Sequence, residues 1–433
     1  MPGGTEGGES VGSAVARERR RSPASPDLID SRYAAWRLAA ALAASTLGNA
    51  AMYVLAVVLP EIQRDFGVGR GEASLSYTAM MAGVGVGGFL CGRWVDRFGA
   101  GRVVALAACG AFAGFTASAM SANLMQFALA HFLLLGFFAI GGSFIPLVAD
   151  TALWWKKRRG VAVAICASGN FLAGTIWPPI AQWGIENFGW RQTFVGFGIV
   201  CGVGMGLLCL RLMQRSPLVD ESAAPSVSGV AAPGSMPFGL SIGAAQWLLF
   251  TAAVGCCVAM AMPQVHIVAY CTDLGFSAAR GAEMLSFVLG FGVVSRLASG
   301  WISDKIGGLR TLLLGSALQA VALALFLPFD SLASLYVISA LFGLFQGGII
   351  PSYAIIVREH FPPQEAGTRT GAVLVGGQVG MALGGWMSGG IFDLTGSYHA
   401  AFLNGIAWNF LNLLIVGFLL WRLSSGGRPL QPA

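Results

Sequence analysis

Two short stretches decide the fold: residues 92–99 (GRWVDRFG) and, 208 positions later, residues 300–307 (GWISDKIG). Each begins and ends with glycine and carries an acid followed by a base. The same offset aligns residues 65–67 (DFG) with residues 273–275 (DLG). Further pairs at this or nearly this spacing are Arg102 with Arg310, Phe194 with Phe402, and Pro146 with Pro351. So many matches in one order predict a chain built from two similar halves.

The composition places these halves in a membrane. Of 433 residues, 55% are hydrophobic and only 11% are charged, whereas a soluble protein carries about 25% charged residues. The 61 glycines suit membrane helices, which pack through small side chains. The eight cysteines show neither a disulfide framework nor zinc-site spacing. The composition therefore argues against a soluble enzyme, and we expect no cofactor and no metal.

Apolar runs of about 20 residues, the length that crosses a bilayer, recur along the chain. They are expected near residues 35–59, 74–93, 103–121, 124–148, 160–182, 191–212, 243–267, 282–301, 311–328, 333–357, 370–391 and 400–422. We predict an all-α membrane protein with twelve transmembrane helices in two pseudo-symmetric six-helix bundles. The expected divisions are a disordered cytoplasmic tail (1–31), an N-terminal half (32–212), a cytoplasmic linker (213–242), a C-terminal half (243–423) and a C-terminal tail (424–433).

The 26 lysines and arginines are distributed unevenly around these spans. With the N-terminus inside, 21 fall in the tails and even-numbered loops, four fall on the opposite face, and Arg296 stays within a span. Because cations collect on the cytoplasmic side, both termini are predicted to be cytoplasmic. We expect a bacterial inner membrane, with a eukaryotic plasma membrane left open. The scattered basic residues predict no nucleic-acid surface, and we expect a monomer in the lipid bilayer.

Parallel six-helix repeats are a known plan of transporters, whose substrate site lies near the midplane between the halves. The Gly-x-x-x-Asp-Arg-x-Gly pattern and its second copy resemble the loop signature of the major facilitator superfamily. A finer resemblance, to the monocarboxylate transporter and oxalate–formate antiporter branch, rests on residues 155–160 (WKKRRG), Ser168-Gly169, Gly174 and the run His266-x-x-x-Tyr270-x-x-Asp273-Leu274-Gly275. The resemblance covers about residues 33–423 and implies the major facilitator fold with transport by alternating access.

In the resembled superfamily the repeated loop motif latches the cytoplasmic gate. Glycines permit tight turns and close backbone approach, and a carboxylate is stabilised at the N-terminus of a helix. The alternative is that the cations only anchor the inner face, but the repeated acid at Asp304 disfavours this because anchoring needs cations alone. The residues assigned to gating are Gly92, Asp96, Arg97, Gly99, Arg102, Gly300, Asp304, Lys305 and Arg310.

Arg296 lies inside the predicted eighth span, one helical turn before Gly300. A charge within a span costs about 2.5–3.5 kcal/mol on insertion scales and is a functional-site hypothesis by default. The resembled branch carries its substrate-binding arginine at this spacing, and a guanidinium binds a carboxylate through two parallel hydrogen bonds. Arg296 therefore predicts an anionic substrate. The alternative is that Arg296 snorkels to the lipid headgroups.

Three departures from the resembled branch bear on the substrate. Gly292 stands where monocarboxylate transporters carry an acid one turn before this arginine, and Tyr53 stands where they carry a lysine in span 1. Span 11 holds Gln378 where the oxalate–formate antiporter has a second cation. No Asp or Glu falls deep within a predicted span. A single cation favours a monoanion over a dianion and puts the familiar proton relay in doubt.

Other polar residues within spans are weaker candidates for the substrate site. They are His266, Tyr53, Asn49, Asn170, Gln346 and Tyr353. His266 can bind a carboxylate or carry a proton, or be an interfacial histidine. The others can line a cavity or join helices by hydrogen bonds. His131 is a weaker candidate still, and the Trp177-Pro178-Pro179 run shapes a gate more readily than it binds a ligand.

These observations predict a secondary active transporter of small organic monocarboxylates that works by alternating access. Proton symport would make the transport of an anion electroneutral, and no residue is assigned that role. The alternative is an exporter of drugs or other amphipathic compounds. The glycines and prolines of span 5, however, are spaced differently from those in the span-5 motif of such exporters. A transport-inactive sensor of the same fold would normally carry a soluble output domain, and we expect the predicted linker and C-terminal tail to be too short for one. The sequence shows no nucleophile–base pair or phosphate-binding loop, so an enzyme is not expected.

Overall fold

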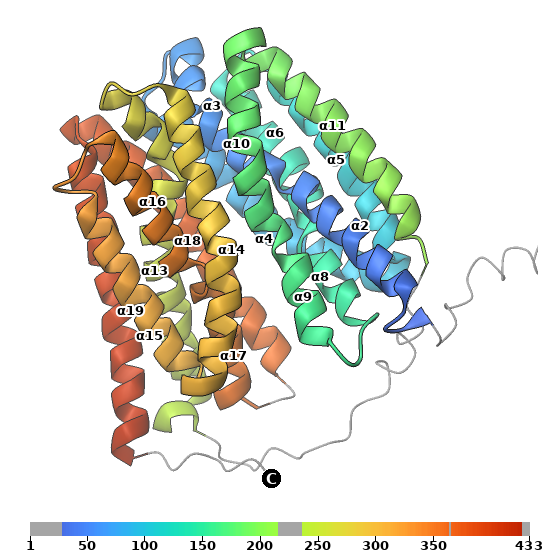
Figure 1. Ribbon diagram of the computed structural model, residues 1–433, viewed down its shortest axis with the longest axis vertical. Helices are drawn as coiled ribbons and strands as arrows, with labels where there is room; N and C mark the ends of the chain where they lie inside the picture. Colours follow the sequence, from blue (N-terminus) through green and yellow to red (C-terminus); the bar gives the residue numbers. More distant parts are fainter. Residues whose placement is uncertain (1–27, 215–235, 363–364, 427–433) are drawn as a thin grey trace, which may run out of the picture.

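The computed structural model describes residues 28–214, 236–362 and 365–426, apart from the side chain of Asp96. Figure 1 shows two helical bundles side by side, one from each half of the chain. The first residues of α2 and the last residues of α19 lie at the same end of the molecule, which we call the terminal side; the opposite end is the far side. The bundles converge at the far side and diverge toward the terminal side (Figure 1).

The N-terminal half contains the six predicted spans, several of them in two or more pieces. Its elements are α2 (Arg32–Gly48), α3 (Ala50–Phe66), α4 (Arg70–Phe98), α5 (Ala100–Ala119), α6 (Leu124–Ala130), the π-helical η2 (His131–Ile140), α7 (Gly141–Ser143), α8 (Ile145–Ala152), α9 (Arg159–Ala167), α10 (Gly169–Phe188) and α11 (Trp190–Arg211).

The C-terminal half also contains six spans. Its elements are the 3₁₀ turn η3 (Pro237–Gly239), α13 (Ile242–Asp273), α14 (Ala278–Ile306), α15 (Gly308–Leu325), α16 (Leu332–Gln346), α17 (Ile349–His360), α18 (Ala366–Thr395) and α19 (Tyr398–Gly426). Among the described residues, eleven spans are long and apolar enough to cross a membrane. The twelfth, α18, is 30 residues long, and its many glycines lower its mean hydropathy. The chain is therefore a multi-pass, all-helical membrane protein.

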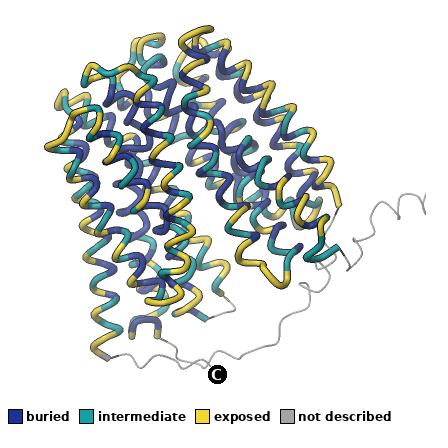
Figure 2. Tube along the Cα trace, in the orientation of Figure 1, coloured by how far each residue is buried: buried dark blue, intermediate teal, exposed yellow. Residues whose placement is uncertain are grey.

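The burial pattern separates interior from lipid-facing helices. Every residue from 252 to 271 of α13 is buried, so this helix lies inside the C-terminal bundle (Figure 2). Outer helices expose large apolar side chains instead, including Leu207 and Leu210 on α11 and Trp421 on α19. Apolar side chains on an outer surface are stable in lipid, where water does not penalise them.

Glycines allow the halves to touch along two helix pairs. At the far side, a Cβ at Gly71 of α4 would lie 3.0 Å from the backbone of Gly390 on α18. Closer to the middle of the spans, a Cβ at Gly174 of α10 would lie 2.4 Å from the Leu289 side chain on α14. Only the absence of these side chains lets α4 pack against α18 and α10 against α14 so closely.

The ends of both halves differ slightly from the predicted divisions. Residues 1–27, 215–235 and 427–433 lie outside the described residues, and with them most of the predicted tails and linker. The predicted disordered tail is wrong at its last residues, because the Asp30 carboxylate accepts 3.1 Å hydrogen bonds from the backbone N–H groups of Lys156 and Lys157. The helix α19 continues to Gly426, three residues beyond the predicted boundary.

Candidate substrate site and gates

Arg296 lies on α14 where that helix faces α9 and α10 of the other half. Its Nη1 donates a 3.0 Å hydrogen bond to the carbonyl oxygen of Ala167, the last residue of α9. Its guanidinium lies 4.3 Å from the ring centre of Phe171 on α10. Its Nε is buried and has no hydrogen-bond partner among the described residues. The guanidinium thus keeps an unused donor at the interface between the halves.

A chain of hydrogen bonds joins three of the predicted polar residues beside Arg296. The Tyr53 hydroxyl donates to Oδ1 of Asn170 over 2.6 Å, and Nδ2 of Asn170 donates to Oδ1 of Asn49 over 3.0 Å. Tyr53 is close enough to Arg296 for the two to interact electrostatically. The structure therefore brings together four predicted site residues from α3, α10, α14 and the break between α2 and α3.

Phe171 occupies the space that a side chain at position 292 would need. A Cβ on Gly292 would lie 2.4 Å from Cε1 of Phe171, so an acid at this position would displace the ring. The same ring stacks over the Arg296 guanidinium. Glycine at position 292 therefore makes room for the Phe171 ring. It also leaves Arg296 without a carboxylate partner one turn away on its own helix.

Gln346 and Tyr353 lie elsewhere, inside the C-terminal half. Gln346 is buried and accepts a 2.9 Å hydrogen bond from Nε2 of Gln264. Tyr353 is fully buried, and its hydroxyl donates to Oδ1 of Asn412 over 3.2 Å. The structure thus does not join these two residues to the group around Arg296. His131 is likewise buried, against the ring of Phe127.

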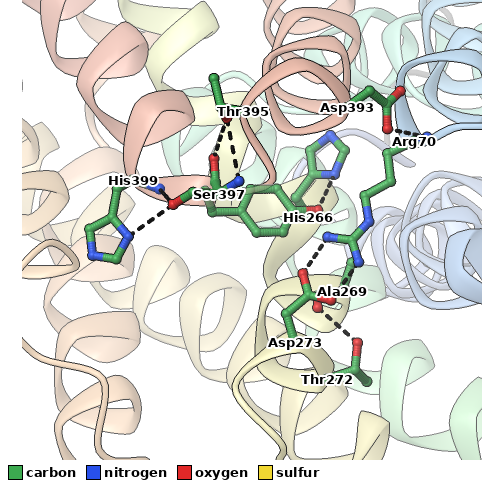
Figure 3. Close-up of polar contacts among 10 residues, drawn as sticks. Arg70, His266, Ala269, Thr272, Asp273, Asp393, Thr395, Ser397 and His399 are labelled. Carbon is green, nitrogen blue, oxygen red and sulfur yellow. Dashed lines mark hydrogen bonds and ion pairs between the residues drawn. The ribbon is translucent and has the colours of Figure 1, made fainter.

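The far side is closed by an ion-pair cluster between the halves (Figure 3). The guanidinium of Arg70, at the start of α4, binds both carboxylate oxygens of Asp273, at the end of α13. The carboxylate of Asp393 on α18 accepts hydrogen bonds of 2.9 and 2.7 Å from the backbone N–H groups of Arg70 and Gly71. A carboxylate at the first turn of a helix is favourable. We call Arg70, Asp273 and Asp393 the far gate.

His266 belongs to the packing behind the far gate. It is buried, and its Nε2 donates to the carbonyl oxygen of Gly385 over 2.8 Å, which leaves Nδ1 to accept from the Tyr398 hydroxyl at 3.1 Å. The structure therefore places His266 apart from the group around Arg296. None of the three far-gate residues was predicted as a site residue, although the alignment of residues 65–67 with residues 273–275 had singled out Asp273.

The repeated loop motif lies on the terminal side, at the turns between α4 and α5 and between α14 and α15. Gly99 has φ +86° and Gly307 has φ +84°, a backbone region that other residues rarely adopt. Close backbone approach is the wrong explanation for Gly92, because a Cβ there would meet no atom within 4 Å; the same open space surrounds Gly300. The two turn glycines thus repeat in structure as they do in sequence.

The other motif residues surround these turns. Lys305 lies 3.6 Å above the Trp301 ring, Arg97 contacts the ring of Phe98, and Arg102, Asp304 and Arg310 are exposed. Glu359, which sequence reasoning missed, accepts hydrogen bonds of 3.2 and 3.1 Å from the N–H of Gly308 at the start of α15. In the C-terminal half, therefore, Glu359 of α17 caps this helix.

Substituting the two glycines of the second motif is expected to have opposite effects. Gly307→Ala forces alanine into a region that costs about 1–3 kcal/mol, so it should lower the thermal unfolding midpoint of the purified protein. Gly300→Ala fills open space in a helix interior, where alanine is favoured over glycine by about 1 kcal/mol, and should leave the midpoint unchanged or raise it. Equal losses in the two variants would contradict this account of the turn.

Two similar six-span bundles, a cation on one span that contacts the other half, and a closed gate at one end are the arrangement expected of membrane transporters built from two parallel repeats. The family model described as Major Facilitator Superfamily matches residues 41–332 and 284–432. The chain belongs to this superfamily. Its family and fold are those of membrane transporters rather than of enzymes.

Solved structures of low sequence identity share the fold. A bacterial homologue of the human lysosomal transporter Spinster, in an inward-facing and occupied conformation, aligns with a TM-score of 0.67 at 16% identity, covering 92% of this chain and 98% of that chain. A peptide transporter, POT, in complex with alafosfalin aligns with a TM-score of 0.68 at 13% identity, covering 89% of this chain and 94% of that chain.

Two curated relatives differ in the function that their names state. Monocarboxylate transporter 13 of Rattus norvegicus is 28% identical over 265 residues, which are 60% of this chain and 60% of that protein. The aspyridones efflux protein apdF of Emericella nidulans is 27% identical over 318 residues, which are 72% of this chain and 61% of that protein. The chain thus spans about three fifths of the length of these relatives.

Proposed function

We propose that the protein is a secondary active transporter of small organic monocarboxylates that works by alternating access. The observation that carries the proposal is the guanidinium of Arg296, which lies within a span, contacts the other half and has a buried Nε without a partner among the described residues. A charge within a span is energetically costly, so a functional role is its default explanation. The similarity to monocarboxylate transporter 13 supports the same substrate class.

The hydrogen bonds around Arg296 favour one carboxylate. The donors of Tyr53 and Asn170 are used within their own chain of hydrogen bonds, so these side chains shape the wall. Arg296 supplies the free donor, and a guanidinium suits the two oxygens of a carboxylate. One such group matches a monoanion, because a second carboxylate would have no cation in this group of residues.

The carbonyl oxygen of Ala167 occupies one of the positions that a substrate oxygen would take. The hydrogen bond from Arg296 to Ala167 crosses between the halves, so a carboxylate that replaces this carbonyl would change a contact between them. Transport requires substrate binding to bias the equilibrium between conformations. We propose that the substrate carboxylate replaces the Ala167 carbonyl oxygen as the hydrogen-bond acceptor of Arg296. Substrate binding would thereby be coupled to movement of the two halves.

The proposed orientation places the terminal side in the cytoplasm, on the strength of the 21 cations in the tails and even-numbered loops and the positive-inside rule. The closed far gate then faces outward and the described state is inward-facing. The proposal extends to a bacterial inner membrane, a monomer, and proton coupling that keeps carboxylate transport electroneutral, with the coupling residue left unassigned.

A second candidate is an exporter of amphipathic compounds. The specific observation that favours it is the similarity to fungal efflux proteins, among them the aspyridones efflux protein and the agnestins efflux protein of Paecilomyces divaricatus, which is 24% identical over 306 residues. Thermal unfolding of the purified protein with a panel of ligands separates the two functions, because a ligand that binds only the folded state raises the unfolding midpoint. Shifts with monocarboxylates support the proposal, and shifts only with amphipathic compounds support the exporter.

Gly292→Asp is expected to raise the monocarboxylate concentration needed for half-maximal stabilisation by about tenfold or more. The new carboxylate lies one turn from Arg296, where opposite charges on a helix pair, and its Cβ displaces Phe171. Titration of the unfolding midpoint with ligand measures the effect. Gly292→Ala is the matched control, because it displaces the ring without adding a charge. If the two variants weaken binding equally, competition by the new carboxylate is not the cause.

A further inference from the structure

A groove lies on the outside of the N-terminal half, between the first turns of α2 and the last turns of α11. Its volume is about 470 Å³, and its lining includes Tyr33, Trp36, Ala39, Ala40, Leu208 and Arg211. This position is remote from both the Arg296 group and the far gate. The groove therefore belongs to neither feature of the proposed transport cycle.

The groove combines an apolar wall with an interfacial rim. Ala39, Ala40 and Leu208 form the apolar part, which runs toward the membrane interior along α2 and α11. Trp36 is 76% exposed, and Tyr33 lies at the first turn of α2. Tryptophan and tyrosine collect at the boundary between bilayer and water, so the rim lies at headgroup depth and the wall at the depth of acyl chains.

Two exposed cations, one lining the groove and one beside it, are unpaired in the part of the chain that the structure describes. Arg211 lines the groove and Arg32 lies one helical turn before Trp36; both are exposed, and neither guanidinium has a hydrogen bond or ion pair among the described residues. The buried carboxylate of Asp150 below the groove is already paired. The buried Arg37 binds the Asp150 carboxylate at 2.8 Å and the carbonyl oxygens of Arg211 and Leu212 at 3.2 Å each.

We propose that this groove binds an anionic phospholipid, with its phosphate on Arg211 and Arg32 and one acyl chain along Ala39, Ala40 and Leu208. Each basic residue near a membrane surface contributes about 1 kcal/mol to the attraction of anionic lipid. The apolar wall can contact an acyl chain, which a free phosphate ion does not have. A lipid, rather than a soluble anion, is the ligand that matches both parts of the groove.

Native mass spectrometry of the full chain, purified in detergent and titrated with phosphatidylglycerol or phosphatidylcholine, tests the proposal. The wild type is expected to bind one phosphatidylglycerol in preference to phosphatidylcholine, and Arg211→Gln to bind it about fivefold more weakly. Arg358→Gln, which removes an exposed arginine from α17 of the other half, is the matched control and should retain the preference.

A second variant tests the acyl-chain part without changing any charge. Ala39→Phe fills the groove from an exposed position and should also weaken lipid binding, while unfolding midpoints in detergent show that both variants remain folded. Undiminished lipid binding in Arg211→Gln or in Ala39→Phe would overturn the proposal. So would stabilisation of the wild type by inorganic phosphate alone to the same extent as by phosphatidylglycerol.

Discussion

Arg296→Gln is expected to reduce monocarboxylate uptake into proteoliposomes by at least about 100-fold while the protein stays folded. Glutamine keeps a hydrogen-bond donor for the Ala167 carbonyl, which Arg296 now contacts at 3.0 Å, but it has neither the charge nor the paired donors that bind a carboxylate. Charge-assisted hydrogen bonds contribute about 1.5–3 kcal/mol each, so the loss of two accounts for an effect of this size. Uptake of labelled substrate measures it.

The conservative variant separates binding from packing. Arg296→Lys retains the charge as a single compact cation, so uptake should fall less than in the glutamine variant and mainly through a higher KM. An unchanged unfolding midpoint in both variants excludes misfolding as the cause. Normal uptake by Arg296→Gln would assign Arg296 to snorkelling or packing and would remove the basis of the monocarboxylate proposal.

Loss of the Arg70–Asp273 ion pair is expected to open the far gate. The pair joins the two halves, and the Arg70 side chain is only 16% exposed. Losing charge-assisted hydrogen bonds of about 1.5–3 kcal/mol shifts a two-state equilibrium by roughly 10- to 100-fold. Arg70→Gln and Asp273→Asn should each shift the population by this amount toward conformations open at the far side.

Cysteine labelling measures this shift directly. Thr78 lies on α4 behind the gate, with its hydroxyl on the Ala382 carbonyl of the other half. In a Thr78→Cys protein in which the exposed Cys109 is replaced, an impermeant maleimide added at the far side should react about 10- to 100-fold faster after either gate substitution. Arg64→Gln, which breaks an exposed pair within α3, should leave the rate unchanged. Equal rates in all variants would show that the ion pair does not hold the gate.

Much of the fold followed from the sequence because its signals are local. Apolar runs define twelve spans, and the glycines of the repeated motif predicted equivalent turns, which the φ angles of Gly99 and Gly307 confirm. The breaks at Asn49 and Ser168 were not predicted, because the residues on both sides are apolar and continue the pattern of a single helix. The glycines that let the halves approach each other were likewise indistinguishable from those facing lipid.

The candidate site was harder to predict, because membrane helices are apolar on all faces and periodicity does not say which face meets the other half. Arg296 stood out through the cost of its charge, whereas Tyr353 and Gln346 sit on faces that turn into their own bundle. Arg70 and Asp273 lie 203 positions apart in the chain, and the buried pair Arg37 and Asp150 lie 113 positions apart. Such pairings depend on tertiary contacts that a single sequence does not reveal.

Counterflow in proteoliposomes tests the central claim most directly, because it needs no assumption about the coupling ion. Vesicles loaded with an unlabelled small monocarboxylate are diluted into a trace of the same labelled compound. We predict transient accumulation of label by the wild type and none by Arg296→Gln. Absence of counterflow with every monocarboxylate in a panel, together with counterflow of an amphipathic compound, would contradict the account and identify the protein as an exporter.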